Sequence, residues 1–243
     1  MSFGYFLPSS VISSFKHRCL NVHPSLLPKY RGAAPIDYAI LNGDEQTGVS
    51  IIDLDEREWD AGRILKQEAL VRICFVGMVG NFNLFTSQKI SPGTTYERLH
   101  HDLAECGAVS LLSVLRDLDH FKLHATHQDS SQASLAPKIS KEMSMIDFQA
   151  MAANEVLRRH RAIGHRYPLF CMVNGKRLLL LDMRIAIDDP EVEAGAVVRE
   201  RSGRVLVGCA DGKGLELVTV RLEGRRACAA GDYLNGRRLV GRL

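Results

Sequence analysis

The stretch that decides the fold is NVHPSLLPKYRGAAP, residues 21–35. Asn21 and His23 stand two positions apart, and side chains at that spacing point to the same face of a β-strand. Pro24 lacks the N–H that a strand ladder needs, so we expect the strand to end there. The sequence therefore predicts a carboxamide and an imidazole side by side at the carboxyl end of a short strand, residues 19–23.

The residues around this strand alternate between apolar runs and amphipathic runs. We expect a helix over residues 33–42, strands over 49–54 and 63–69, and a long helix over 96–118. The apolar face expected for the long helix consists of Leu99, Leu103, Val109, Leu112 and Leu115. Alternation of strands and helices is typical of an α/β layer fold.

The C-terminal part of the chain has a different pattern. A helix is expected over residues 148–163, followed by a hairpin that turns at Asn174-Gly175. Further short strands separated by glycine turns predict a small β-barrel. Residues 120–140 are polar and aperiodic and read as a connector, so we place the domain boundary near residue 135.

Residues 74–90, CFVGMVGNFNLFTSQKI, fit neither pattern. They carry no charge before Lys89 and show no clear period, and removing them would join a strand smoothly to a helix. We therefore interpret this segment as a local insertion.

Charge is distributed unevenly along the chain. The net charge is +3, with 19 basic against 13 acidic residues after position 134 and 12 against 15 before it. A basic C-terminal half indicates a polyanionic partner, although a solvated surface would have the same composition.

The sequence argues against several classes of protein. Its six cysteines have irregular spacing and form no C-x-x-C pair, which disfavours a zinc site or a disulfide framework and favours buried thiols in a reducing compartment. No apolar run reaches the 18 residues that a membrane helix needs.

A third polar residue belongs with the pair on the first strand. Asp60 lies in the loop segment WDAG, where Gly62 allows a tight turn, and it could orient His23. The amide of Asn21 can donate to a developing oxyanion, and an imidazole can accept a proton at neutral pH. These groups suit acyl transfer to an amine, because the amine loses a proton while the carbonyl oxygen gains charge. Spacing alone favours a strand cap, an ordinary histidine and a turn-forming aspartate, because such pairs are common in strands.

Four segments together carry a family resemblance. They are NVHPSLLPKYRGAAPI at 21–36, GDEQTGVSIIDLDEREWDAG at 43–62, APKIS at 136–140 and RAIG at 161–164. This combination resembles the methionyl-tRNA formyltransferases, and RAIG resembles the mitochondrial type of animals. Arg31, where the glycinamide-ribonucleotide branch would have proline, indicates the tRNA branch.

The resemblance implies a role for each site residue. Asn21 would bind the formyl oxygen as it becomes an oxyanion, His23 would assist proton removal from the amine, and Asp60 would hold His23 and a water. The donor would be 10-formyltetrahydrofolate, with no metal. The residues implied in binding it are Leu7, Ser25, Leu26, Leu27, Pro28 and Asp55.

The resemblance also implies the architecture. Residues 1–134 would form part of a Rossmann-like formyltransferase domain, α/β in class, and residues 135–243 an OB-like β-barrel that binds initiator methionyl-tRNA. Because the match begins partway into the catalytic domain, we expect the family's first strands to be missing and the support of the site to be weakened.

The family further implies a monomer that acts in mitochondrial translation initiation, in the matrix and off the membrane. No presequence is evident, although residues 1–18 share the serine-rich, acid-free composition of a transit peptide. Three alternatives stay open at this point: another folate-dependent formyltransferase, for example one acting on a sugar nucleotide, a catalytically silent RNA-binding module, and an unstable fragment.

Overall fold

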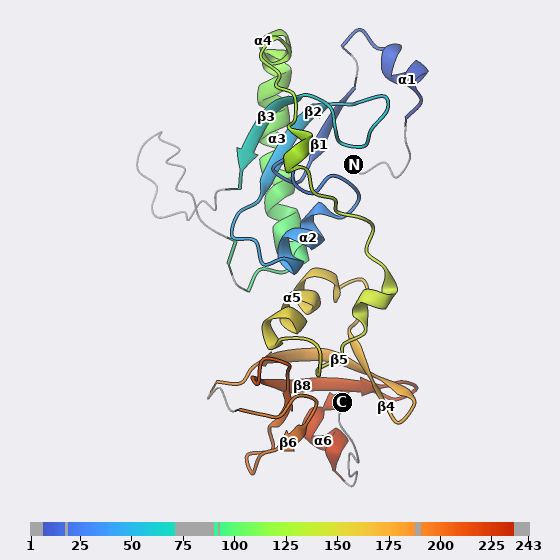
Figure 1. Ribbon diagram of the computed structural model, residues 1–243, viewed down its shortest axis with the longest axis vertical. Coiled ribbons are helices and arrows are strands. Elements are labelled where there is room, and N and C mark those ends of the chain that lie inside the picture. The colour runs from blue at the N-terminus through green and yellow to red at the C-terminus, as the bar shows by residue number, and fades with distance from the viewer. Residues whose placement is uncertain (1–6, 18, 71–89, 92, 188–190, 236–243) are drawn as a thin grey trace. The chain divides into compact units, whose positions relative to one another are not determined.

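The computed structural model describes residues 7–17, 19–70, 90–91, 93–187 and 191–235. These residues divide between two compact units, Met1–Lys138 and Ile139–Leu243. The insertion hypothesis for residues 74–90 concerns a segment that lies, except for its last residue, outside the described residues. The elements of each unit are drawn in Figure 1.

The first unit is built on a three-stranded sheet. Its strands are β1 (Leu20–His23), β2 (Gly48–Asp53) and β3 (Ile64–Ala69), in the order β1-β2-β3, and both pairings are antiparallel. Every residue of β2 is buried, because it is the central strand. The α/β class of the sequence analysis is confirmed, and each of the three predicted strands lies within one residue of its expected position.

A long helix covers one face of this sheet (Figure 1). Helix α3 (Tyr96–Arg116) contacts β2, β3 and β1, and the Oγ1 atom of Thr95 accepts from the N–H of Arg98 at its start. The prediction for the apolar face was wrong at three of its five residues: Leu99 and Leu103 are buried, but Val109, Leu112 and Leu115 are exposed. The helical period from Leu103 instead passes through Gly107, Ser110 and Val114.

The small residues on α3 explain why that face is buried. A Cβ atom at Gly107 would lie 2.8 Å from the side chain of Val22, so only glycine lets the helix approach β1 this closely. The helix ends at Arg116, two residues earlier than expected, and a further helix, α4 (Leu118–Leu123), follows.

Short elements complete the first unit. Helix α2 (Pro35–Leu41) confirms the expected helix, with Pro35 at its first turn, where the missing proline N–H costs nothing. Helix α1 (Ser9–Ser13) and the 3₁₀ turn η1 (Ser130–Gln132) have no counterpart in the sequence analysis.

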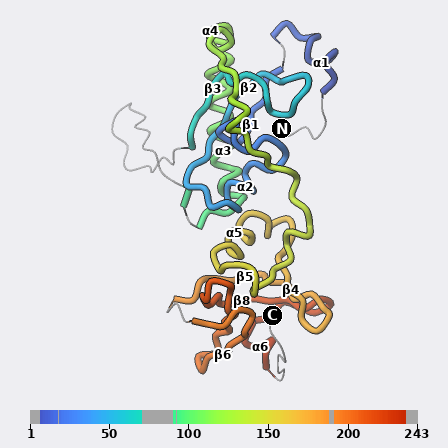
Figure 2. The backbone as a smooth tube through the Cα atoms, viewed as in Figure 1, coloured from blue at the N-terminus to red at the C-terminus, as the bar shows by residue number. Residues whose placement is uncertain are grey.

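The segment expected to be a plain connector is part of the first unit. Thr126 forms an antiparallel bridge with Ile64, at the start of β3, and Leu135 forms a parallel bridge with Arg31. In Figure 2 this segment, yellow-green in colour, descends from α4 past the strands. It therefore joins two parts of the first unit that are distant in sequence.

The second unit is a curled antiparallel sheet. The strand order is β4-β5-β8-β7-β6, and β9 also pairs with β8. The strands are β4 (Phe170–Val173), β5 (Lys176–Ile185), β6 (Val197–Arg199), β7 (Val205–Gly208), β8 (Gly214–Leu222) and β9 (Cys228–Ala229). The predicted hairpin is confirmed: Asn174 and Gly175 join β4 to β5, and both have positive φ.

Helical elements flank this sheet in sequence. They are η2 (Lys141–Ser144), α5 (Ala153–Ile163) and α6 (Ala230–Leu234). Helix α5 begins five residues later than predicted, because the carboxylate of Asp147 accepts from the N–H of Gln149 in a turn.

Five cysteines fall within the described residues, and all five are free thiols. Burial raises the pKa of Cys171 and of Cys209 to about 12, so both stay protonated and unreactive at neutral pH. Among the helices described, none is long and apolar enough to span a membrane. Within the described part of the chain, no three histidine, cysteine, aspartate or glutamate side chains lie together so that they could hold a metal ion.

Candidate active site

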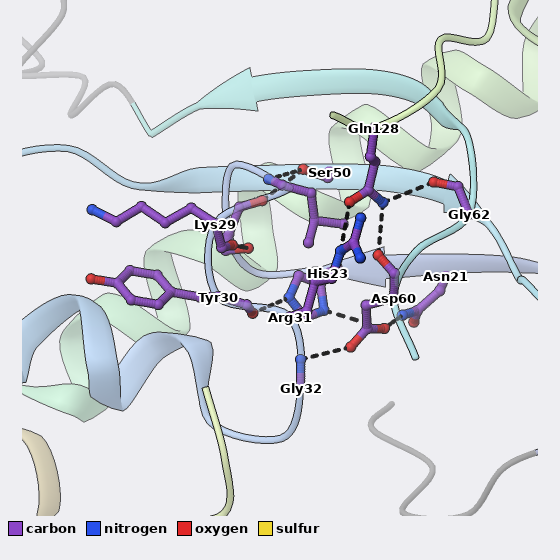
Figure 3. A network of polar contacts seen from close by, with 12 residues as sticks. Asn21, His23, Lys29, Tyr30, Arg31, Gly32, Ser50, Asp60, Gly62 and Gln128 are labelled. Carbon is purple, nitrogen blue, oxygen red and sulfur yellow. Dashed lines mark hydrogen bonds and ion pairs between the residues drawn. The ribbon is translucent and has the colours of Figure 1, made fainter. Parts of the chain in front are cut away.

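Strand β1 presents its polar pair as the sequence predicts. His23 is paired with Ser50 and Asn21 with Ile52 on the buried central strand, which fixes the register of both side chains. Val22, between them, points toward α3, and its side chain lies where a Cβ atom on residue 107 would collide with it. Asn21 and His23 therefore share the other face (Figure 3).

Asp60 reaches this pair from the loop between β2 and β3. Its carboxylate accepts a hydrogen bond from Nδ2 of Asn21 at 3.2 Å and another from the N–H of Gly32 at 2.9 Å. Its backbone has φ of 52°, in the left-handed region that few residues other than glycine adopt. The structure thus brings the three predicted residues together.

The histidine ring has a defined orientation. His23 is 3% exposed, and its Nε2 atom lies 2.9 Å from the carbonyl oxygen of Tyr30. A carbonyl only accepts, so Nε2 must carry the proton of this hydrogen bond. In the neutral ring the basic nitrogen is therefore Nδ1, which lies 3.6 Å from Oδ1 of Asp60.

This arrangement can accept a proton and hold the resulting charge. When Nδ1 of His23 is protonated, it faces the carboxylate of Asp60 as an ion pair in a largely buried setting. The second hydrogen on Nδ2 of Asn21 is not used by Asp60 and is available to an oxyanion. The chemistry supported is attack by an amine on a carbonyl carbon.

The loop after β1 is held rigidly by its own polar groups. The hydroxyl of Ser25 donates to the carbonyl of Lys29, and the Oγ atom of Ser50 accepts from the N–H of Leu27 and donates to the carbonyl of Ser25. Gln67 donates to both the carbonyl of Leu27 and the hydroxyl of Ser50. The loop is thereby fixed to β2 and β3.

The residues expected to bind the donor differ in their surroundings. Ser25 and Leu27 are buried and shape the loop from inside, whereas Leu26 and Pro28 are half-buried on it. The carboxylate of Asp55 accepts from the N–H groups of Arg57 and Glu58 and forms a turn before Asp60. Leu7 is half-buried two positions before α1. Their roles in binding stay predictions.

Tyr30, which supplies the carbonyl for His23, is itself anchored. Its hydroxyl donates to Asp44 at 2.8 Å and accepts from Asn42 at 2.8 Å. Burial, the largest cause, raises the pKa of Tyr30, so the phenol stays neutral. The carbonyl that orients His23 therefore belongs to a residue whose side-chain hydroxyl is itself held by two hydrogen bonds.

The sequence analysis did not predict several residues of this network. Gly32 acts through its N–H, Tyr30 through its carbonyl and Gln128 through an amide in the supposed connector (Figure 3). Backbone groups leave no trace in a sequence, and Gln128 stands in a polar stretch without a period. A positive signal was available only for Gly32, as a glycine after Arg31 in a turn.

Comparison with protein families agrees with this geometry. Residues 1–74 match the family model described as "Formyl transferase", and residues 138–238 match "Formyl transferase, C-terminal domain". Among solved structures, HypX from Aquifex aeolicus, in complex with tetrahydrofolic acid, aligns with a TM-score of 0.58 over 88% of this chain and 34% of that one, at 20% identity. The fold and the site thus define a formyltransferase.

More specific relatives narrow the class. The methionyl-tRNA formyltransferase of Acidobacterium capsulatum is 33% identical over 99% of this chain and 70% of its own length. A methionyl-tRNA formyltransferase structure from Clostridium thermocellum aligns with a TM-score of 0.54 over 76% of this chain and 70% of that one, at 19% identity. The chain belongs to the methionyl-tRNA formyltransferase family.

Proposed function

We propose that this chain transfers the formyl group of 10-formyltetrahydrofolate to the amino group of methionyl-tRNA. The observation that carries the proposal is the contact of Asn21, His23 and Asp60 in a member of the methionyl-tRNA formyltransferase family. The chain supplies both groups that this transfer needs, a hydrogen-bond donor for the oxyanion and a base.

Each step assigns one task to one side chain. As the methionyl nitrogen bonds to the formyl carbon, Asn21 donates its second amide hydrogen to the oxygen that becomes negative. Nδ1 of His23 takes the proton that the nitrogen loses, and Asp60 stabilises the imidazolium. The bond from the formyl carbon to the folate nitrogen then breaks, and His23 returns its proton to that nitrogen.

The donor would bind beside the loop after β1. The fit rests on the rigidity of that loop: Ser25 and Leu27 are fixed by internal hydrogen bonds, which leaves Leu26 and Pro28 in place to contact a flat ring. We assign the same role to Leu7 and to the turn at Asp55. When bound, the donor supplies the formyl group already attached to nitrogen.

The RNA partner would meet the basic second unit. Phosphate contacts supply most of the affinity of proteins for nucleic acid, independently of sequence. Arg225 and Arg226, adjacent and exposed after β8, are our candidates for such contacts. We propose that the chain acts as a monomer. Its resemblance to the animal type motivates placing it in mitochondria, which import of the labelled chain into isolated mitochondria would test.

The choice of formyl acceptor separates this function from its nearest alternative. The purified chain, with formyl-labelled 10-formyltetrahydrofolate, would be offered methionyl-tRNA and an amino-sugar nucleotide in turn. Label recovered on methionyl-tRNA alone supports the proposal, and label on the sugar alone would assign the chain to sugar formyltransferases. Salt-sensitive tRNA binding without any transfer would favour the silent RNA-binding module instead.

A further inference from the structure

The backbone at Asp60 needs support that its own loop does not provide. A non-glycine residue with positive φ costs free energy and persists only where its surroundings hold it. The carboxylate is held by Asn21 and by the N–H of Gly32, but these bonds leave the carbonyl of Asp60 to be fixed from elsewhere.

Gln128 holds this loop from the opposite side. Its Nε2 atom donates to the carbonyl of Asp60 at 2.7 Å and to the carbonyl of Gly62 at 2.8 Å. Its Oε1 atom accepts from Nε of Arg31 at 2.9 Å. Both amide hydrogens and the amide oxygen of Gln128 are therefore used, and all three bonds go to the segments that carry the site.

Arg31 links the amide oxygen of Gln128 to the loop that carries Asp60. It is 4% exposed, and its NH1 atom lies 2.8 Å from Oε1 of Glu58, two residues before Asp60. Its N–H donates to the carbonyl of Ser134, further along the segment that contains Gln128. The guanidinium thus stands between Gln128 and Glu58, as Figure 3 shows in part.

We propose that Gln128 is a positioning residue, which sets the place of the Asp60 carboxylate by holding the two carbonyl groups around it. It acts through Asp60 and touches none of the reacting atoms. The kinetic part of this inference rests on the proposed function, whereas the structural part does not.

The substitution Gln128→Glu tests these hydrogen bonds with little change in the shape of the side chain. Glutamate keeps the acceptor for Arg31 but turns the donor to Asp60 and Gly62 into an oxygen facing two carbonyl oxygens. Gln128→Ala removes all three bonds. Gln132→Ala, at an exposed glutamine four positions on, whose side chain contacts its neighbour Ser131, is the matched control.

The first readout is independent of activity. The N–H of Gly32 donates to the carboxylate of Asp60, so its hydrogen exchange in NMR reports where that carboxylate lies. We expect Gln128→Glu to speed exchange at Gly32 about tenfold, as the loss of one hydrogen bond would. The N–H of Ala34, bonded to the carbonyl of Ala136, should exchange as in the unchanged chain. Unchanged exchange at Gly32 in both Gln128 variants would overturn the proposal.

The second readout is kinetic. In Gln128→Glu we expect kcat to fall about 10- to 100-fold, as for a misplaced catalytic group, while KM for both substrates stays within about twofold. A wild-type kcat in this variant would contradict positioning by the donor atoms. If the unchanged chain transfers no formyl group, the proposed function fails, and exchange at Gly32 still decides the role of Gln128.

Discussion

The Nδ2 atom of Asn21 lies 3.2 Å from Oδ1 of Asp60, although 39 positions separate the two residues. Antiparallel pairing of β1 with β2 brings the start of the Asp60 loop beside Asn21. The loop can return so closely because Gly62 has no side chain: a Cβ atom there would lie 1.7 Å from the carbonyl oxygen of Asp53. The close backbone contact at Gly62 therefore constrains the loop that carries Asp60, alongside the hydrogen bonds from Gln128.

Gly62→Ala should consequently disturb the site from two residues away. We expect it to destabilise the chain by about 1–3 kcal/mol, as overpacking does, and to lower the formyl transfer rate. Denaturant unfolding measures the first effect. Gly93→Ala is the control, because among the described residues no atom beyond its chain neighbours lies within 4 Å of its added Cβ. Equal stability of the two variants would show that the contact of Gly62 with Asp53 is not a constraint.

His23→Ala should lower kcat by about two decades or more, as loss of a positioned base does. Steady-state kinetics with methionyl-tRNA measures this. His101→Ala is the control, because His101 is exposed on α3 and pairs with Glu105. Near-normal turnover without His23 would remove it from the mechanism.

Replacing both Arg225 and Arg226 by alanine should weaken tRNA binding and flatten its dependence on salt, because each phosphate contact releases counterions. Binding titrations at several salt concentrations measure the slope. The matched pair Arg98→Ala and Arg116→Ala, on α3 of the first unit, should leave the slope unchanged. If the two double variants behave alike, the RNA surface lies elsewhere.

Glu216 should make the stability of the second unit dependent on pH. It is buried on β8, and the hydrogen bond from Arg184, the largest cause, lowers its pKa below the ordinary 4.5. A lowered pKa means that this stabilisation is complete above the unfolded-state value and is lost as the pH falls through the folded-state value. Glu216→Gln should therefore lower the thermal midpoint by several degrees at pH 7, with the difference shrinking below about pH 4.

The control for this prediction is Glu223→Gln, since Glu223 is exposed after the same strand. It should show no such difference at either pH. A deficit in Glu216→Gln that persists undiminished in acid would mean that shape rather than charge makes the contact with Arg184 stabilising.

The sequence predicted those features that depend on local pattern. Alternation placed Asn21 and His23 on one face of β1, and the Asn174-Gly175 dipeptide located the hairpin of the second unit. The face of α3 was partly mispredicted, because close packing favoured Gly107 and Ser110 over the larger Leu112 and Leu115.

Features that depend on distant backbone groups could not be predicted in this way. Gln128 bonds to carbonyls 66 and 68 positions earlier in the chain, and neither those carbonyls nor that distance is encoded in a local period. The orientation of His23 likewise comes from the carbonyl of Tyr30, which any residue would supply. Such contacts emerge only once the chain is folded.

The most direct test of the account is single-turnover formyl transfer to methionyl-tRNA by the chain and by its Asp60→Asn variant. The single oxygen of asparagine can still accept from the N–H of Gly32, but its amide nitrogen replaces the oxygen that accepts from Asn21, and it lacks the charge that stabilises protonated His23. We predict measurable transfer by the unchanged chain and a rate lower by about two decades or more in the variant. Equal rates in the two proteins would contradict the assigned role of the Asn21, His23 and Asp60 group.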